Sequence, residues 1–367
     1  MTIGTELTAE FRLATEKDRW LDAYDHTKLS AMNVCPTWGI TRYQMHKKMP
    51  GEGRAMALEA GTAMHQVFAF IRLVTLMNQM EDEDQPEAKV RSVWDFHGGR
   101  LFGAERLAQI KEQIKNAEDV IDVCKRGAVA VLDTSGFYDD PRDKRRTLSN
   151  MEECAYAYIN RWRWDHPVWV RNRDDPLSDV GIEIPFDLVV HIRGIRDLSF
   201  RLTGRIDGIH WDALQRLTIH DNKTASRLGD AWSMAQQTNH QYTGYCVAAS
   251  VFTQHPVCHC DVLGLALPLP RTYDFGGFLR EPMMRHQHHI NRWVEWLVHT
   301  ITLERAYRDD PIGAPKYTHS CNRYFRPCPL IPFCYADDDE QRQILQEMVT
   351  DEWSPLRKEV LDGVGDS

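Results

Sequence analysis

The chain has 367 residues, of which 43% are hydrophobic and 26% are charged, and its formal net charge at pH 7 is −9. This length supports one elaborated domain or two closely joined ones, and the composition is that of a globular protein. The acidic balance argues against a protein that coats nucleic acid indiscriminately, although it leaves room for a local basic channel.

The sequence suggests neither a membrane span nor export. The longest apolar stretches, near 67–77 and 247–252, are too short or too interrupted to cross a bilayer. Residues 1–20 are polar and acidic and lack the apolar region of a signal peptide. We therefore expect a cytoplasmic protein with no membrane partner, in which the nine cysteines suit metal binding better than disulfides.

The first half of the chain is expected to be helical. Short helices between residues 8 and 48, broken near Cys35, precede a long helix that opens near Ala55. Apolar residues at helical spacing predict another helix over about 103–126, and a further helix is expected over 148–164.

The hydrophobic period changes after residue 180. Alternate residues from Ile182 to Ile192 are apolar, which is typical of a strand, and two further strand-like runs contain Asp207 and Asp221. A helix over 229–252, a strand over 260–267 and a long helix over about 279–307 are expected to follow. Strands between helices predict an α/β fold with a central mixed sheet flanked by helices.

Three segments are expected to pack as one unit. A helical N-terminal region over 1–175 contributes Cys35 and His65, a sheet-containing core covers 176–310, and a Cys-rich tail covers 311–367.

The most informative segment runs from Thr203 to Thr224. It places Asp207 on one strand-like run, and Asp221 and Lys223 on the next. Because residues i and i+2 of a strand face the same way, Asp221 and Lys223 project together, and Asp207 can converge on them if the runs form a hairpin. Two carboxylates and one ammonium suit a divalent-cation site for phosphodiester cleavage. The alternative is an ordinary surface ion pair, since Asp-x-Lys is a common triplet.

Weaker features accompany this segment. Gly61 and His65 share a helix face, and His65 could bind metal or contact a phosphate, or could be a packed core histidine. Gln241 and Tyr245, also four apart on a helix, can present an amide and a phenol to a nucleotide, or can cap a core face. Glu183 lies on the alternating strand and is either one more carboxylate for the metal or an outward-facing acid.

Three cysteines lie close together in a proline-rich tail. Cys321, Cys328 and Cys334 are spaced more loosely than the Cys-x-x-Cys pairs of most zinc sites. An iron–sulfur cluster requires a fourth thiolate, for which Cys35 is the best candidate because it too precedes a proline and lies outside the predicted sheet. Zinc on the same thiols, or three unrelated cysteines, are the alternatives.

Basic residues occur in several places. The segment 161–173, RWRWDHPVWVRNR, interleaves Arg with Trp, a composition suited to stacking on bases and contacting phosphates. Basic clusters near 42–54 and 142–146 could also contact DNA. A solvated surface is the alternative for each of them.

In their order along the chain, these motifs resemble the PD-(D/E)XK nuclease superfamily. The resemblance is to the RecB-like branch whose members carry an iron–sulfur cluster, which includes AddB-type helicase–nucleases and the nucleases of CRISPR adaptation. The matching features are a helix with GxxxH, a strand ending in GRID, a strand with DxK, a helix with QxxxY, and one early and three late cysteines. They extend from Cys35 to Cys334.

The resemblance implies a restriction-endonuclease-like core and a metal-dependent DNA exonuclease that acts on ends or single strands. It places Mg²⁺ or Mn²⁺ among His65, Asp207 and Asp221, and it implies that Lys223 orients or activates the attacking water. It further implies that the active site is lined by Gln241 and Tyr245, and that a [4Fe–4S] cluster is held by Cys35, Cys321, Cys328 and Cys334. A helicase, a recombinase or another nucleic-acid-processing protein is the expected partner.

The chain departs from the family pattern in a few places. The interval between Cys321 and Cys328 is longer than usual, and Asn222 stands where an aromatic residue is frequent. No GxxxxGK[ST] phosphate loop is present, so we expect a stand-alone nuclease or a subunit. The alternative function is a non-catalytic DNA-end-binding or recombination subunit on a nuclease fold, against which the intact Asp/Asp/Lys set argues.

Overall fold

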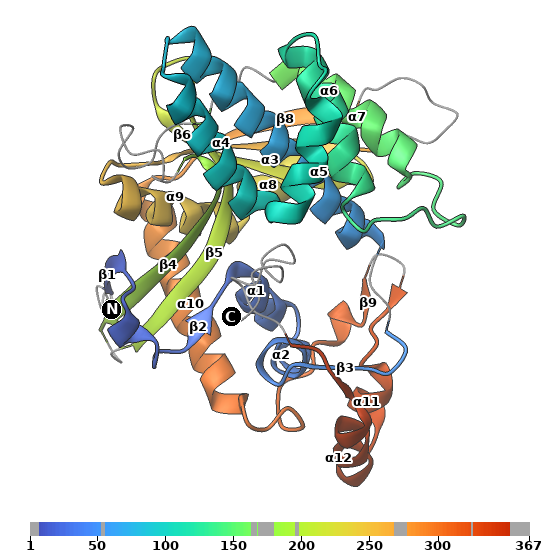
Figure 1. Cartoon of the computed structure of the whole chain (residues 1–367). Helices are drawn as coiled ribbons and strands as arrows, with labels where there is room; N and C mark the ends of the chain where they lie inside the picture. The colour runs from blue at the N-terminus through green and yellow to red at the C-terminus, as the bar shows by residue number, and fades with distance from the viewer. Residues whose placement is uncertain are drawn as a thin grey trace. The chain divides into compact units, whose positions relative to one another are not determined.

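The computed structural model describes residues 7–52, 56–162, 167, 180–194, 198–267, 277–323 and 326–352. It confirms an α/β protein with a mixed, seven-stranded sheet and flanking helices (Figure 1). The strand order is β1-β4-β5-β6-β7-β8, and β2 pairs with β5. These strands are β1 (Thr8–Leu13), β2 (Ala23–Tyr24), β4 (Ile182–Arg193), β5 (Leu198–Trp211), β6 (Leu217–Ala225), β7 (His259–Ala266) and β8 (Phe278–Met284).

Helices occupy most of the remaining described chain. The α-helices are α1 (His26–Val34), α2 (Pro36–Gly39), α3 (Met56–Asp82), α4 (Glu87–Phe102), α5 (Ala104–Ile114), α6 (Val120–Asp133), α7 (Leu148–Trp162), α8 (Asp230–Gln237), α9 (His240–Thr253), α10 (Gln287–Tyr307), α11 (Ile331–Tyr335) and α12 (Asp338–Glu347). Short helical turns are η1 (Glu16–Asp18), η2 (Ile40–Gln44) and η3 (Thr318–Ser320). Two small ribbons pair β3 (Lys47–Lys48) with β11 (Val349–Thr350), and β9 (Asn322–Arg323) with β10 (Arg326–Pro327).

Four expectations for individual elements were wrong. The helix expected over 229–252 is two helices, α8 and α9, and Asn239 caps the start of the second by accepting a hydrogen bond from the Gln241 N–H. Residues 8–13 form a strand rather than a helix, because they pair antiparallel with β4. The helix expected over 103–126 is two helices, and Asp119 caps the start of the second by accepting a hydrogen bond from the Asp122 N–H. Residues 278–284 form a strand rather than the start of α10. Among the described residues this strand pairs with β7 alone, and an edge strand of this kind tolerates Pro282.

The chain forms two compact units, each assembled from separate segments. The first unit contains residues 1–53, 186–204 and 286–357, and the second contains 54–185, 205–285 and 358–367. Strands β4 and β5 pass from one unit into the other.

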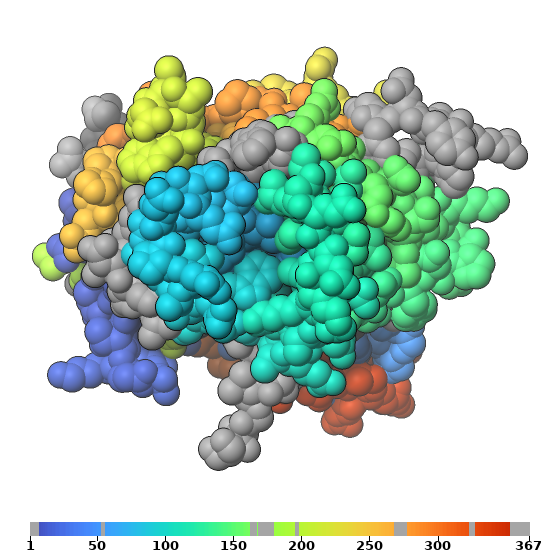
Figure 2. All heavy atoms as spheres, turned by 45° about the horizontal axis from the view of Figure 1, so that its top comes forward, coloured from blue at the N-terminus to red at the C-terminus, as the bar shows by residue number. Residues whose placement is uncertain are grey.

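In the second unit, helices cover both faces of β6 and β7. Leu263 and Leu265 of β7 share a hydrophobic core with α3, and helices α4 to α7 complete this core (Figure 1). Figure 2 shows the outer face of this helical layer, in cyan to green. Gly264 projects to the opposite face, where it lies against Trp232 of α8. By length and composition α3 could cross a bilayer, but 83% of its most apolar window is buried in the protein, as in a core helix.

In the first unit, a small apolar core holds the C-terminal segment together. Leu330, Phe333 and Met348 are buried and form its centre. Trp38, which belongs to α2, packs against this core, so residues from both ends of the chain meet there. Cys328 and Cys334 lie at its edge.

Candidate functional site

The site begins where β5 and β6 stop pairing. Their antiparallel ladder runs from Trp211 and Leu217 to Gly208 and His220. Immediately beyond the last paired residues, a side chain takes the place of a backbone acceptor. The Asp207 Oδ2 accepts a hydrogen bond of 2.8 Å from the backbone N–H of Asn222. The predicted hairpin therefore exists, and it brings Asp207 to the residue that separates Asp221 from Lys223.

Asp221 and Lys223 form a close pair on one face of β6. Lys223 Nζ lies 2.7 Å from Asp221 Oδ2, and the Asp221 side chain is fully buried. The Tyr242 hydroxyl of α9 lies 3.3 Å from the same oxygen and 2.8 Å from Gln236 Oε1. Asp221 Oδ1 has no hydrogen-bond partner within the described part of the chain. A buried carboxylate oxygen without a donor is suited to binding a cation.

His65 and two carboxylates form the second half of the site. His65 Nδ1 lies 3.1 Å from Asp207 Oδ2 and 4.0 Å from Glu183 Oε1. One ligand atom from each of these residues lies within 4.8 Å of the other two. Glu183 has a left-handed backbone, with φ of +47°, and its side chain also faces Arg205 at 3.7 Å. Non-glycine residues adopt this backbone at an energetic cost, and such residues cluster at functional sites.

The charged groups of this site shift one another's pKa values. Burial alone would raise the pKa of Asp207, but nearby His65 and Lys223 outweigh it and hold that pKa well below its usual range. Burial, which the Asp207 charge reinforces, raises the pKa of Asp221 despite the attraction of Lys223. Burial opposes protonation of His65, yet Asp207 and Glu183 raise its pKa to about 9. Burial likewise opposes protonation of Lys223, yet the two aspartates raise its pKa above its ordinary value.

Gln241 and Tyr245 contact each other along α9. The Gln241 side-chain amide donates a hydrogen bond of 2.6 Å to the Tyr245 hydroxyl. The helical spacing that predicted a shared face is thus confirmed. Lining of the active site by this pair stays a prediction.

Two residues that contact the aspartates were not predicted from the sequence. Tyr242, which contacts Asp221, lies in the QYTGY motif between the predicted residues Gln241 and Tyr245. Arg72 of α3 donates a hydrogen bond of 2.9 Å to the Asp207 carbonyl. A Cβ at Gly208 would lie 2.5 Å from this guanidinium, so the glycine permits the close approach. The sequence signal for Arg72 is its place as an isolated arginine within the apolar stretch of α3.

The four predicted thiol ligands line one cavity in the first unit. The cavity has a volume of about 170 Å³. Its lining consists of Cys35, Trp38, Lys316, Tyr317, Thr318, Ser320, Cys321, Cys328, Leu330, Ile331, Cys334 and Tyr335. Cys35 lies at the junction of α1 and α2, and Cys334 lies in α11. The structure therefore brings together cysteines from both ends of the chain.

Local turns hold these thiols in place. The Cys328 N–H donates to the Cys321 carbonyl at 2.7 Å, and the Cys334 N–H donates to the Leu330 carbonyl at 2.8 Å. Burial, with the neighbouring Cys35 and Cys328, raises the pKa of the Cys334 thiol to about 11, although Lys316 opposes the shift. Burial also raises the pKa of the Cys328 thiol. These thiols favour the neutral form unless a metal compensates the thiolate charge.

The predicted basic surfaces are only partly described. Residues 163–166 and 168–173 of the Arg–Trp segment lie outside the described residues. In the other clusters, Arg42 pairs with Asp351 at 2.6 Å, and Arg142 pairs with Asp140 at 2.7 Å. Nearby aspartates therefore neutralise part of the positive charge that was expected to contact DNA.

No protein-family model matches the chain, and no curated protein matches it either. The activity of the protein must therefore be inferred from its own residues.

Proposed function

We propose that the protein is a Mg²⁺- or Mn²⁺-dependent deoxyribonuclease of the PD-(D/E)XK superfamily, in its RecB-like branch, that hydrolyses DNA from ends or on single strands. The observation that carries the proposal is the convergence of Asp207 from β5, Asp221 and Lys223 from β6, and His65 from α3 in one group of interacting charges whose two aspartates are buried. These are the residues that the motif resemblance assigns to the metal site and the attacking water.

The donor set fits a hard divalent cation. Asp207, Glu183 and His65 offer two carboxylates and an imidazole within a small volume, and Asp221 offers an unpartnered carboxylate oxygen. Carboxylate oxygens are the preferred ligands of Mg²⁺, and Mn²⁺ also accepts imidazole. A bound Mg²⁺ or Mn²⁺ ion supplies a water of lowered pKa and stabilises the charge that develops on the phosphate.

The chain's own residues orient the reactants. Lys223 remains an ammonium because the aspartates raise its pKa, and its side chain is 30% exposed, so it can add positive charge where a phosphate approaches. The Tyr242 hydroxyl of α9 contacts the Asp221 carboxylate and helps to fix its position. His65 orients Asp207 through their 3.1 Å contact. Fixed side chains of this kind reduce the reorganisation required during the reaction.

The thiol cavity is proposed to hold a structural [4Fe–4S] cluster on Cys35, Cys321, Cys328 and Cys334. The proposal is supported by the shared cavity that these four cysteines line, and four thiolates are the ligand set of such a cluster.

Digestion assays test the catalytic proposal. Purified protein is incubated with linear single- and double-stranded DNA, labelled at either end, and with closed circular DNA, with Mg²⁺, with Mn²⁺ or with chelator. We expect metal-dependent loss of linear substrates and survival of the circles. Binding of DNA ends without digestion under every metal condition would instead support the non-catalytic subunit.

A further inference from the structure

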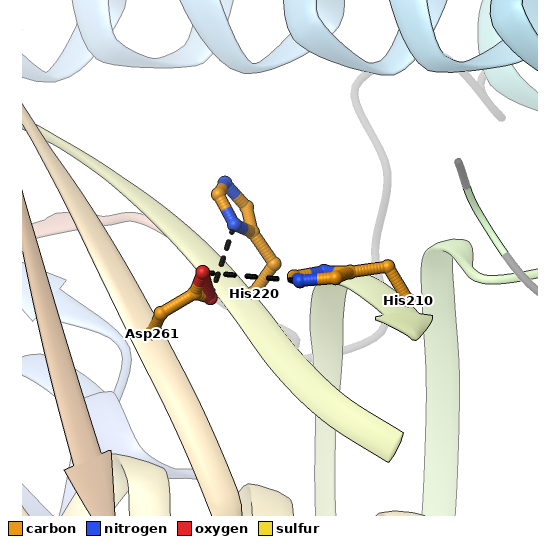
Figure 3. Close-up of side chains that lie close together, drawn as sticks. All are labelled: His210, His220 and Asp261. Carbon is orange, nitrogen blue, oxygen red and sulfur yellow. Dashed lines mark ion pairs between the residues drawn. The ribbon is translucent and has the colours of Figure 1, made fainter. Parts of the chain in front are cut away.

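A second histidine–carboxylate cluster lies in the second unit, in addition to the proposed catalytic site. It consists of His210 on β5, His220 on β6 and Asp261 on β7, which are three adjacent strands (Figure 3). All three residues are buried, with at most 7% of their surface exposed. His220 and Asp261 are direct partners in the β6–β7 ladder, so their side chains share a face of the sheet.

This cluster and the catalytic pair occupy opposite faces of β6. Successive side chains of a strand point to opposite faces, so His220 and Asn222 face one side while Asp221 and Lys223 face the other. The face that carries His220 also carries Leu263, which packs in the core shared with α3. The cluster and the Asp221–Lys223 pair therefore lie on opposite faces of β6.

The distances in the cluster match metal coordination better than hydrogen bonding. His220 Nδ1 lies 3.4 Å from Asp261 Oδ1, and His210 Nε2 lies 3.8 Å from Asp261 Oδ2. An N–H···O hydrogen bond spans about 2.7–3.2 Å. Two ligands on a tetrahedral zinc ion, with bonds of about 2.0–2.2 Å, lie about 3.3–3.5 Å apart. Within the described residues, His220 Nδ1 and Asp261 Oδ1 make no hydrogen bond although both are buried.

Asn222 prepares His220 to act as a ligand. Its Oδ1 lies 2.9 Å from His220 Nε2, so it accepts a hydrogen bond from the tautomer that carries its proton on Nε2. In that tautomer the Nδ1 lone pair faces a carboxylate oxygen, and a cation between the two atoms removes their repulsion. Metal-bound histidines are commonly oriented in this way, by a hydrogen bond from the second ring nitrogen to an acceptor. This role also explains an asparagine at the position between Asp221 and Lys223.

We propose that His210, His220 and Asp261 bind a zinc ion that joins β5, β6 and β7. Two imidazole nitrogens and one carboxylate oxygen form a suitable zinc donor set, and a water molecule completes the tetrahedron. The ion stabilises the sheet beside the point where β5 and β6 separate around Asp207. The proposal does not depend on nuclease activity, because zinc content and thermal stability are measured without DNA.

Arg280 provides the competing account. Its Nε lies 3.4 Å from Asp261 Oδ2, so a guanidinium could supply the positive charge in place of a metal. The two accounts predict opposite effects of Arg280→Met. Removal of a nearby positive charge strengthens zinc binding if the metal is present, whereas it leaves Asp261 uncompensated and destabilises the protein if no metal binds.

Zinc content of the full-length protein tests the proposal directly. After chelation and reconstitution with Zn²⁺ alone, we expect one zinc equivalent that is lost in His210→Asn and Asp261→Asn but retained in Asp207→Asn and Cys334→Ser. Asn222→Ala should weaken zinc binding by about 10–100-fold, the usual cost of losing an orienting contact. Co²⁺ at this site should give visible d–d absorption without the near-ultraviolet thiolate band expected from a cysteine site.

Stability measurements cover the case in which the variants fold poorly. Chelation of wild-type protein should lower its melting temperature, Zn²⁺ should restore it, and Arg280→Met should bind zinc at least as tightly as wild type. The proposal is overturned if wild type binds no zinc that depends on Asp261, or if Arg280→Met is destabilised equally with and without Zn²⁺.

Discussion

The Asp207 carboxylate accepts a hydrogen bond of 2.8 Å from the backbone N–H of Asn222, at the point where β5 and β6 cease to pair. This contact fixes an acid of one strand beside the Asp221 and Lys223 pair of the next. Because Asp207 uses Oδ2 for the Asn222 contact and for His65, its placement depends on both β6 and α3. The site thus uses the separation of two strands to gather side chains that a regular ladder would keep apart.

Removal of either member of the β6 pair should abolish cleavage. Asp221→Asn removes the carboxylate charge, and Lys223→Met removes the ammonium while it retains the aliphatic stem. We expect each change to reduce the rate of DNA hydrolysis by about 10³-fold or more, because both act on the reacting groups. Single-turnover digestion measures the rates, and circular dichroism checks the fold.

Asp95→Asn is a matched control. Asp95 forms an ion pair with Lys111, as Asp221 does with Lys223, but on the exposed surface. The substitution should leave the cleavage rate within about twofold of wild type, as expected for a surface pair. Equal losses of cleavage rate in Asp95→Asn and Asp221→Asn would contradict a catalytic role for the Asp221–Lys223 pair.

Tyr242→Phe should impair catalysis by releasing Asp221. The change removes a hydroxyl that lies 3.3 Å from Asp221 and 2.8 Å from Gln236. We expect kcat to fall about tenfold with little change in KM for DNA, and the free energy of unfolding to fall by about 1–3 kcal/mol, since buried acceptors lose a donor. Tyr245→Phe, which removes the hydroxyl that accepts a hydrogen bond from Gln241, is the comparison. A larger change in KM than in kcat for Tyr242→Phe would indicate a role in DNA binding.

Metal binding should strengthen as pH rises. The pKa of metal-free His65 is about 9, so the imidazole is protonated at neutral pH and must lose its proton to ligate an ion. Mn²⁺ affinity is therefore expected to increase about tenfold per pH unit between about pH 6.5 and 8.5. His65→Asn should reduce that slope. Identical slopes in the two proteins, measured by electron paramagnetic resonance titration of Mn²⁺, would exclude His65 as a ligand.

Glu183→Gly should separate backbone strain from metal binding. Glycine adopts the left-handed backbone at this position without the cost that a glutamate has, so the free energy of unfolding should rise by about 1 kcal/mol. Glu183→Gln retains the strain and loses only the charge. We expect both variants to bind Mn²⁺ more weakly, whereas only Glu183→Gly is stabilised in urea unfolding. Tight Mn²⁺ binding by both would show that Glu183 is not a ligand.

Cys334→Ser should remove the proposed cluster. Loss of one of four thiolates should bleach the brown absorbance, lower the iron content and reduce the melting temperature, because the cluster joins α2 to the C-terminal segment. Cys258→Ser is the control: Cys258 is also partly exposed, but it does not line the thiol cavity. A colourless wild-type protein with the same stability as Cys334→Ser would contradict the assignment.

Long periodic segments and adjacent motif residues could be predicted from the sequence. The alternation from Ile182 to Ile192 identified β4, and the apolar run after Ala55 identified α3, because each pattern is sustained over many residues. The spacing of Asp221 and Lys223 fixed their common face. The convergence of Asp207 followed from the hairpin.

Features that depend on tertiary contacts could not be predicted. Residues 8–13 carry no decisive pattern and become a strand only because β4 offers an edge. The left-handed backbone of Glu183 is not signalled by the alternation of apolar residues in this segment. The pairing of His220 with Asp261 requires the parallel β6–β7 register, which no local signal specifies.

Cleavage of end-labelled linear DNA by wild type, Asp207→Asn and Asp221→Asn, with and without Mn²⁺, tests the central claim most directly. We expect rapid, metal-dependent digestion by wild type only, with both variants folded and retaining their iron. Equal digestion by all three proteins, or none by folded, iron-loaded wild type on any DNA substrate, would contradict the assignment of these carboxylates to a nuclease site.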